Sequence, residues 1–389
     1  MFRIAGVATS FFASLLLIGG AINGQETRPT KELISAINRF IKSQEVDEME
    51  PGLAILVREP GQLEFKKAYG LANLKTGERI SSRTLFELAS LSKPFTATAV
   101  LMLVERNKLT LDQDVRSILP EIPAYRDDSP ILVRHLLSHT SGLPEYFDFE
   151  LEPTRNKSYV DNADYLPMFA RLKADYPQEF KAGSTYRYCN SNYLLLALIV
   201  ERVSGKAFSE FMKEEFFVPL KMNDTFIHAS PNSIPTNSEI GPNRAVGYEW
   251  SDKKMKWRST WGTPNDSNEY GLIVGDGSIW TNIEDLMKWD DAVRSRKLLK
   301  PNTWKLALTP ALTSKGKPLG YGLGWQLYYE DSTKINGFGH NGSWAGFQTI
   351  YYYSNVTRRT TVLLCNRSDL DVDEIWTELE SIFERHQKK

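Results

Sequence analysis

Two residues near position 90 have the types and the spacing that nucleophilic catalysis requires. Ser90 and Lys93 are three positions apart, so on a helix they lie on the same side, one turn from each other. Pro94 is tolerated only near the start of a helix, which places the first turn close to Ser90. The serine then lies at the positive end of the helix dipole, and a buried lysine amine can accept its proton. This pair predicts that Ser90 is a nucleophile activated by Lys93.

Two further segments carry polar groups suited to the same chemistry. A Ser-x-x-Lys pair is common by chance, so its meaning depends on what accompanies it. The phenol of Tyr188 can relay protons, and the amide of Asn190 can bind a substrate carbonyl or hold the lysine. His340 is followed two residues later by Gly342, and a glycine there allows a substrate backbone to approach a strand edge closely. We therefore expect one site, assembled from three segments that are far apart in the chain.

The order of these segments and their surroundings resemble a known family, that of class C β-lactamases, DD-peptidases, D-aminopeptidases and related serine esterases. The family is marked by Ser-x-x-Lys, then Tyr-x-Asn, then a Lys/His-x-Gly triplet. The surroundings match in residues 86–96, 135–144 (a signature loop), 275–286 and 321–325. Since the likeness runs from about residue 30 to the end, chance does not explain it.

The resemblance implies a catalytic role for each polar residue. Ser90 would attack the acyl carbon and form an acyl-enzyme, while Lys93 and Tyr188 would share the acid and base work. Tyr188 would also activate the water that releases the acyl group. Asn190 would bind the amide side of the substrate.

The third triplet is implied to bind the substrate. The backbone N–H groups of Ser90 and Ser343 would form the oxyanion hole, beside Gly342, and His340 would offer a hydrogen bond to the substrate and to Tyr188. Many β-lactamases of the family have lysine in place of His340, and a permanent ammonium helps to hold the carboxylate of a β-lactam. A histidine near Lys93 should be mostly neutral at pH 7. A histidine at this position is similar to what the peptidase and esterase branches of the family have. Slow acylation of the protein by penicillin is still expected.

Composition narrows the classes of partner. The chain has 389 residues, with 47 Lys and Arg against 48 Asp and Glu, and no block of like charge stands out. We therefore expect a small-molecule or peptide substrate and no nucleic acid. The two cysteines, Cys189 and Cys365, are too few for a disulfide framework or a zinc cluster. A single bridge between them stays open, and two buried free thiols are the alternative that we favour.

Metal and nucleotide motifs are incomplete. His135 and His139 are four apart, a spacing that suits zinc on a helix. The chain lacks the glutamate beside the first histidine that a metalloprotease motif needs, so we expect both residues to brace the signature loop. The glycine-rich run 320–324 leads into an aromatic strand, and no P-loop lysine follows. We expect neither a metal nor a cofactor.

The N-terminus has the pattern of a secretory signal peptide, with Arg3 followed by an apolar stretch and small residues. We expect cleavage near Gly24, and the alternative is an uncleaved membrane anchor. The anchor would be the only membrane contact. A glycan on Asn341 would block the site, so we expect a bacterial periplasmic or secreted protein rather than one from a glycosylating pathway.

The elements that must position the site are strands at both ends of the chain and helices between them. Residues 30–42 and 193–203 have helical periodicity, and residues 53–57 and 63–69 are predicted to form a hairpin. Further strands are predicted at 323–329, 334–339, 347–353 and 361–365, and a last helix follows them. The fold class is α/β: an antiparallel sheet flanked by helices, like that of β-lactamases and transpeptidases, with a mostly helical insert.

We therefore expect a signal peptide, 1–24, and one serine hydrolase domain, 25–389. Within it, residues 30–89 and 265–389 form the sheet subdomain and residues 90–264 the helical insert, and loops 147–175 and 230–266 wall the pocket. The favoured function is hydrolysis of D-amino-acid peptides or carboxylic esters. The alternatives are a class C-like β-lactamase and a non-catalytic penicillin-binding protein.

Overall fold

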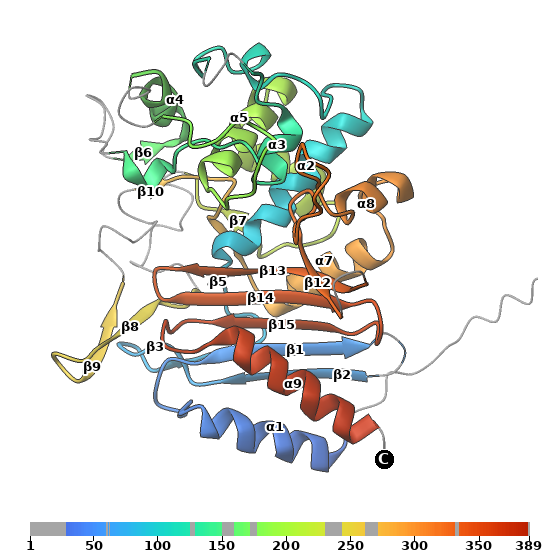
Figure 1. Ribbon diagram of the computed structural model, residues 1–389. Coiled ribbons are helices and arrows are strands. Elements are labelled where there is room, and N and C mark those ends of the chain that lie inside the picture. The colour runs from blue at the N-terminus through green and yellow to red at the C-terminus, as the bar shows by residue number, and fades with distance from the viewer. Residues whose placement is uncertain are drawn as a thin grey trace, which may run out of the picture.

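Strands from both ends of the chain form one six-stranded antiparallel sheet (Figure 1). The computed structural model describes residues 29–59, 61, 63–124, 129–149, 159–171, 177–229, 243–260, 271–330 and 334–387. The strand order is β12-β13-β14-β15-β1-β2. These strands are β1 (Leu53–Glu59), β2 (Leu63–Tyr69), β12 (Gln326–Tyr329), β13 (Ile335–Trp344), β14 (Phe347–Ser354) and β15 (Thr360–Cys365). The predicted fold class is confirmed.

Two terminal helices cover one face of the sheet. They are α1 (Lys31–Ser43) and α9 (Val372–Gln387), which lie together in Figure 1. Thr30 caps α1 by accepting a hydrogen bond from the backbone N–H of Leu33 at 3.2 Å. Along β1, Leu53, Ile55 and Val57 pack toward these helices, and the alternate residues join the core on the other face.

The helical part of the chain packs on the other face of the sheet. Its helices are α2 (Lys93–Glu105), α3 (Val133–Leu137), α4 (Asn162–Arg171), α5 (Ser191–Ser204), α6 (Phe208–Met212), α7 (Ile283–Arg294) and α8 (Pro301–Ala307). Most of α2 and α5 is buried, because both sequences are apolar around the whole helix. Gly205 ends α5 in a left-handed conformation.

Short strands complete the architecture around these layers. They are β3 (Leu71–Asn73), β4 (Glu78–Arg79), β5 (Phe86–Glu87), β6 (Val160–Asp161), β7 (Phe226–Ile227), β8 (Tyr248–Ser251), β9 (Lys256–Ser259), β10 (Gly271–Leu272) and β11 (Ile279–Thr281).

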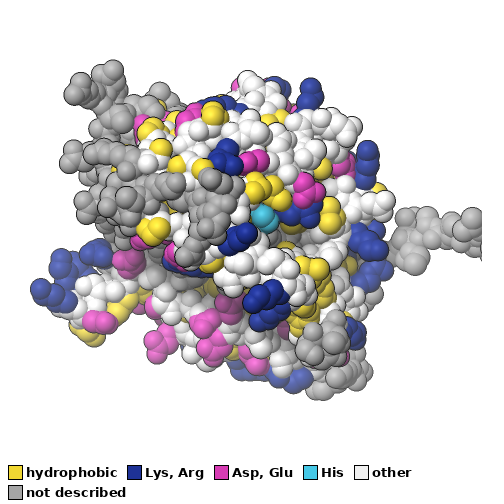
Figure 2. Space-filling model, turned by 45° about the horizontal axis from the view of Figure 1, so that its top comes forward, with side chains coloured by type: hydrophobic (Ala, Val, Ile, Leu, Met, Phe, Trp, Pro, Cys, Tyr) yellow, Lys and Arg dark blue, Asp and Glu magenta, His cyan; other side chains and the backbone are white. Residues whose placement is uncertain are grey.

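Lys and Arg side chains are dispersed in small groups among acidic ones on the face that Figure 2 shows. Within the described ranges, no helix is both long and apolar enough to span a bilayer.

The strand that carries His340 is longer than the sequence predicted. The strand predicted at 334–339 continues through the His340 triplet as β13, because Asn341 and Ser343 pair with Ile350 and Gln348 of β14. Cys189 and Cys365 are buried free thiols. The predicted signal peptide lies outside the described residues, as do parts of loops 147–175 and 230–266. The division into subdomains stays a prediction.

Candidate active site

Ser90 lies in the short 3₁₀ helix η1 (Ala89–Ser92), which leads directly into α2. Ala89 has φ of 50°, a left-handed conformation that is uncommon for a residue with a side chain. The strained backbone stands immediately before the candidate nucleophile, where stored strain is often found in enzymes. The Nζ atom of Lys93 lies 2.9 Å from the Oγ atom of Ser90, so the two side chains meet as the spacing predicted.

The amine of Lys93 is fully buried and has three oxygen neighbours. Besides Ser90, they are the Oδ1 atom of Asn190 at 2.8 Å and the backbone carbonyl of Asp276 at 3.1 Å. Burial lowers the pKa of Lys93 to about 8, against the opposing effect of the carboxylates of Asp276 and Glu145. A substantial fraction of the amine is therefore neutral near pH 8.

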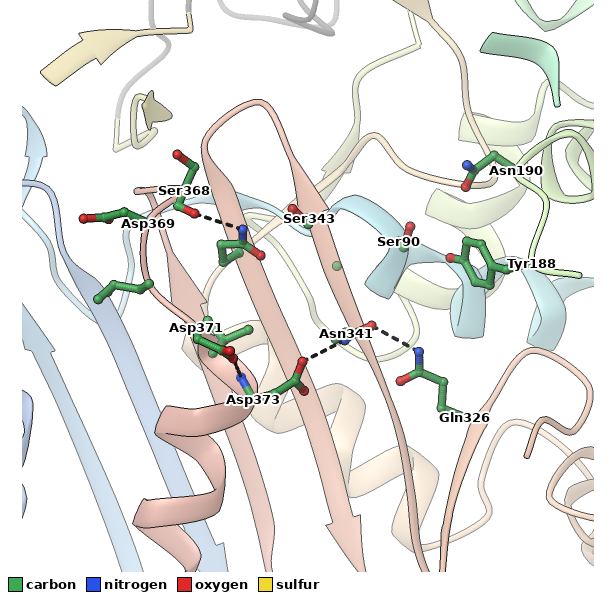
Figure 3. A pocket seen from close by; sticks show the side chains of 14 residues that line it. Ser90, Tyr188, Asn190, Gln326, Asn341, Ser343, Ser368, Asp369, Asp371 and Asp373 are labelled. Atoms are coloured by element: carbon green, nitrogen blue, oxygen red, sulfur yellow. Dashed lines mark hydrogen bonds between the residues drawn. The ribbon is translucent and has the colours of Figure 1, made fainter. Parts of the chain in front are cut away.

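Tyr188 lies beside Lys93, and its hydroxyl is directed toward Ser90 in Figure 3. The Nζ atom of Lys93 is 4.9 Å from the centre of the phenol ring. The imidazole of His139 stacks on the same ring with 4.2 Å between ring centres. Burial raises the pKa of Tyr188 well above its usual value, so the phenol is protonated at neutral pH.

Gly342 brings β13 against the nucleophile. A Cβ atom at this position would lie 2.3 Å from the carbonyl oxygen of Leu88 and 2.9 Å from the backbone nitrogen of Leu91. The backbone that approaches this glycine is therefore that of the chain itself, on both sides of Ser90. The expected approach of a substrate backbone to this strand edge stays a prediction.

His340 lies beneath the site and not in its wall. Its side chain is fully buried. The Nδ1 atom is 2.6 Å from the carbonyl oxygen of Asn341, so it donates the hydrogen bond, and Nε2 accepts one from the Tyr321 hydroxyl at 3.0 Å. Burial, reinforced by Lys93, lowers the pKa of His340 to about 3. The imidazole is neutral, as expected, but both its nitrogens are occupied by protein groups.

A cleft of about 660 Å³ opens over Ser90 (Figure 3). It extends across the outer faces of β13 and β14 to the start of α9. Its described lining residues are Ser90, Tyr188, Asn190, Gln326, Asn341, Gly342, Ser343, Gln348, Ser368, Asp369, Leu370, Asp371, Val372 and Asp373. This described lining includes three aspartates and neither lysine nor arginine, so the wall opposite the nucleophile is acidic.

Several residues of the site were not assigned a role from the sequence. Asp276 and Tyr321 come from segments that matched the family outside the triplets, and Glu145 directly follows another such segment, so this match is the signal that could have found them. The two histidines of the signature loop do brace the backbone, since His135 accepts the N–H of Leu132 at 3.1 Å and His139 that of Cys189 at 3.0 Å. Among the residues that the structure describes, no cluster of metal-ligating side chains occurs.

The chain is similar in sequence or in fold to several known proteins. A penicillin-binding protein of Bacillus subtilis is 28% identical over 321 residues, which cover 81% of this chain and 68% of that protein. A D-aminopeptidase of Cereibacter sphaeroides is 25% identical over 317 residues, and this chain matches only 57% of its length. The solved structure of a penicillin binding protein from Bacillus halodurans has a TM-score of 0.72 at 24% identity, over 89% of this chain and 98% of that one. The family model described as Beta-lactamase matches residues 37–381, and the chain therefore belongs to the beta-lactamase family of serine hydrolases.

Proposed function

We propose that this protein is an exported hydrolase that forms an acyl-enzyme at Ser90 and acts on D-amino-acid amides and peptides or on uncharged esters. The observation that carries the substrate class is the cleft, whose described wall is acidic and has no cation to receive a carboxylate. The roles of the individual residues follow from their hydrogen-bond partners.

Lys93 is the base that activates Ser90. A neutral amine has two protons and one lone pair. Two neighbours of Nζ, the side-chain oxygen of Asn190 and the carbonyl of Asp276, only accept hydrogen bonds, so they take both protons. The lone pair is left for the Ser90 hydroxyl at 2.9 Å. The serine proton passes to Lys93 as the Oγ–carbon bond forms.

Tyr188 acts as a proton donor and relay. Because its pKa is raised by burial, the phenol keeps its proton in the resting site. It is placed to donate that proton to the leaving group and to recover it from the water that releases the acyl group. The backbone N–H groups of Ser90 and Ser343 are assigned to the oxyanion hole by the family resemblance.

The acidic wall disfavours a substrate that places a carboxylate against it. Asp369 is compensated by Arg367, which donates to both its oxygens at 2.7 Å. Asp371 and Asp373 have no such cation among their hydrogen-bond partners that the structure describes. A β-lactam carboxylate would meet these like charges, whereas the ammonium of an unblocked D-amino acid would be attracted.

Two further points support the proposal. One relative, from Cereibacter sphaeroides, is named a D-aminopeptidase. The proposed export rests on the first 24 residues, whose composition is that of a signal peptide, and a bacterial periplasmic or secreted location is proposed with it. A β-lactamase is the second candidate, supported by the family but not by the charge of the cleft.

A substrate panel tests the proposal. D-alanine p-nitroanilide, its N-acetyl derivative, p-nitrophenyl butyrate and nitrocefin would be assayed with the wild type, Ser90→Ala and Asp373→Asn. We expect kcat/KM for the unblocked D-alanine anilide to exceed that for the N-acetyl form by about tenfold, because one charge-assisted hydrogen bond contributes about 1.5 kcal/mol. Asp373→Asn should reduce this preference, and Asp252→Asn on the β8–β9 hairpin is the control. Nitrocefin as the fastest substrate would overturn the proposal in favour of a β-lactamase.

A further inference from the structure

The signature loop lies against the segment that carries Tyr188 and Asn190. Its hydrogen bonds to that segment form a series along the backbone. The Cys189 N–H donates to His139, the Ser191 hydroxyl to the carbonyl of Pro144 at 2.7 Å, and the Ser141 hydroxyl to the Asn192 side chain at 2.6 Å. The loop therefore holds in place the segment that carries Tyr188 and Asn190.

Glu145, the residue directly after this loop, makes the contacts closest to the reacting groups. One carboxylate oxygen, Oε2, accepts hydrogen bonds from the backbone N–H of Asn190 at 2.8 Å and from its side-chain Nδ2 at 3.1 Å. The other oxygen accepts the backbone N–H of Tyr146 at 3.0 Å. Glu145 is partly buried and is not among the described residues that line the cleft.

The chemistry of a carboxylate determines how the Asn190 amide is oriented. An ionised carboxylate only accepts hydrogen bonds, so the NH₂ end of the amide must face Glu145. The oxygen end then faces Lys93, where Oδ1 lies 2.8 Å from Nζ. If the amide turned over, its NH₂ group would face the Lys93 amine and donate to it. The lone pair of Lys93 would then be directed at Asn190 and not at Ser90.

We propose that Glu145 is a positioning residue for acylation, which holds Asn190 in the orientation that directs the Lys93 lone pair to Ser90. The inference rests on the proposed role of Lys93 as base, and it does not depend on which substrate the cleft accepts.

The charges around Lys93 provide a second readout. Its acidic neighbours are Glu145, directly after the signature loop, and Asp276 from the β10–β11 connection. The other titratable groups around it are Tyr188, Cys189 and Tyr193 from α5 and the segment before it, and the imidazoles of His139 and His340. Burial raises the pKa of Cys189 to about 12, and that of His340 is lowered to about 3, so neither changes charge near neutral pH. Glu145 and Asp276 are the anions that hold up the pKa of the Lys93 amine.

The test is labelling of Ser90 by a fluorophosphonate probe, which reports nucleophile activation without any choice of substrate. In Glu145→Gln, the new amide can donate to Asn190 and allow its side chain to turn over. We expect the second-order labelling rate to fall by about tenfold to a hundredfold, the cost of a misplaced catalytic group. Removal of the negative charge should also move the rise of the rate with pH down by about half a unit to one unit.

Glu201→Gln is the matched control. Glu201 is also a partly buried glutamate that accepts a backbone N–H, that of Phe208 at 2.8 Å, but it lies at the far end of α5. We expect its labelling rate and pH profile to equal those of the wild type. A purely structural role for Glu145 would lower the stability of Glu145→Gln without moving the pH profile, and that result would overturn the inference.

A double-mutant cycle with Asn190→Ala tests whether Glu145 acts through Asn190. If it does, Glu145→Ala should slow labelling by about tenfold or more in the wild type, but by less than about threefold in the Asn190→Ala background, because coupled residues are not additive. Equal factors in the two backgrounds would contradict the inference. Slow turnover of the D-alanine anilide with normal fluorophosphonate labelling would count against the substrate proposal instead, so the two failures are distinguishable.

Discussion

The α-carbon of Gly342 on β13 faces the carbonyl oxygen of Leu88, so closely that a Cβ atom there would be 2.3 Å from that oxygen. The Thr349 hydroxyl donates to the same oxygen at 2.7 Å from the neighbouring strand β14. The 3₁₀ turn that carries Ser90 is therefore held against the sheet by direct backbone approach. The position of the nucleophile depends on the absence of a side chain at residue 342.

Gly342→Ala should displace this turn and the Ser90 hydroxyl with it. We expect kcat/KM to fall by about a hundredfold, the usual cost of a shift of about 1 Å in a catalytic group. Gly320→Ala is the control, because no described atom lies within 4 Å of a Cβ there and its φ is not in the left-handed region. Equal activities of the two variants would show that the turn relaxes without moving Ser90.

Ser90 should be the residue that a fluorophosphonate or a penicillin modifies. The Ser90 hydroxyl is hydrogen-bonded to Lys93, and Ser90 lines the cleft, whereas the nearby Ser92 is fully buried. Mass spectrometry of the digested protein should find the added mass on the peptide that contains Ser90, and Ser90→Ala should remain unlabelled. A label on Ser92, Ser141 or Ser343 would contradict the assignment.

The rate of acylation should rise with pH as Lys93 loses its proton. The base acts in its neutral form, so the rate increases as pH rises through a pKa of about 8 and levels off above it. Lys93→Ala should abolish this limb and lower kcat/KM by about 10²-fold to 10⁴-fold. The measurement is kcat/KM between pH 5.5 and 10. A limb near pH 6.5 in the wild type would instead indicate a titrating histidine, against the depressed pKa of His340.

Two neighbouring aspartates of α7 should differ sharply in their effect on stability. Both bind the Arg58 guanidinium, Asp290 at 3.4 Å and Asp291 at 2.8 Å, but Asp290 is fully buried and the Asp291 side chain is 62% exposed. Asp290 also accepts hydrogen bonds from Thr360 at 2.6 Å and Tyr351 at 2.9 Å. Asp290→Ala leaves these groups without their acceptor.

We expect Asp290→Ala to lower the free energy of unfolding by about 3 to 5 kcal/mol, and Asp291→Ala by less than about 1 kcal/mol. Urea unfolding at pH 7.5 measures both. Similar losses for the two variants would mean that the bond to Arg58, and not burial, determines the contribution.

The sequence by itself predicted the main strands and terminal helices and the contact between Ser90 and Lys93. Ser90 and Lys93 meet because residues three apart on one turn are neighbours whatever the rest of the fold does. The helix of residues 31–43 and its Thr30 cap, the hairpin near the N-terminus and the C-terminal helix also follow from local periodicity and capping.

Only the tertiary structure decided which groups surround the lysine and which of them face the cleft. Glu145 and Asn190 are 45 residues apart, and no periodicity relates them. The motif of His340 predicts a substrate-binding residue, yet its side chain is buried and hydrogen-bonded to Tyr321. Asp371 and Asp373 follow β15 as ordinary polar residues, and they line the cleft only because the start of α9 lies beside β13 and β14. Burial and charge at a site depend on segments that meet through the folding of the whole chain, so local sequence patterns do not predict them.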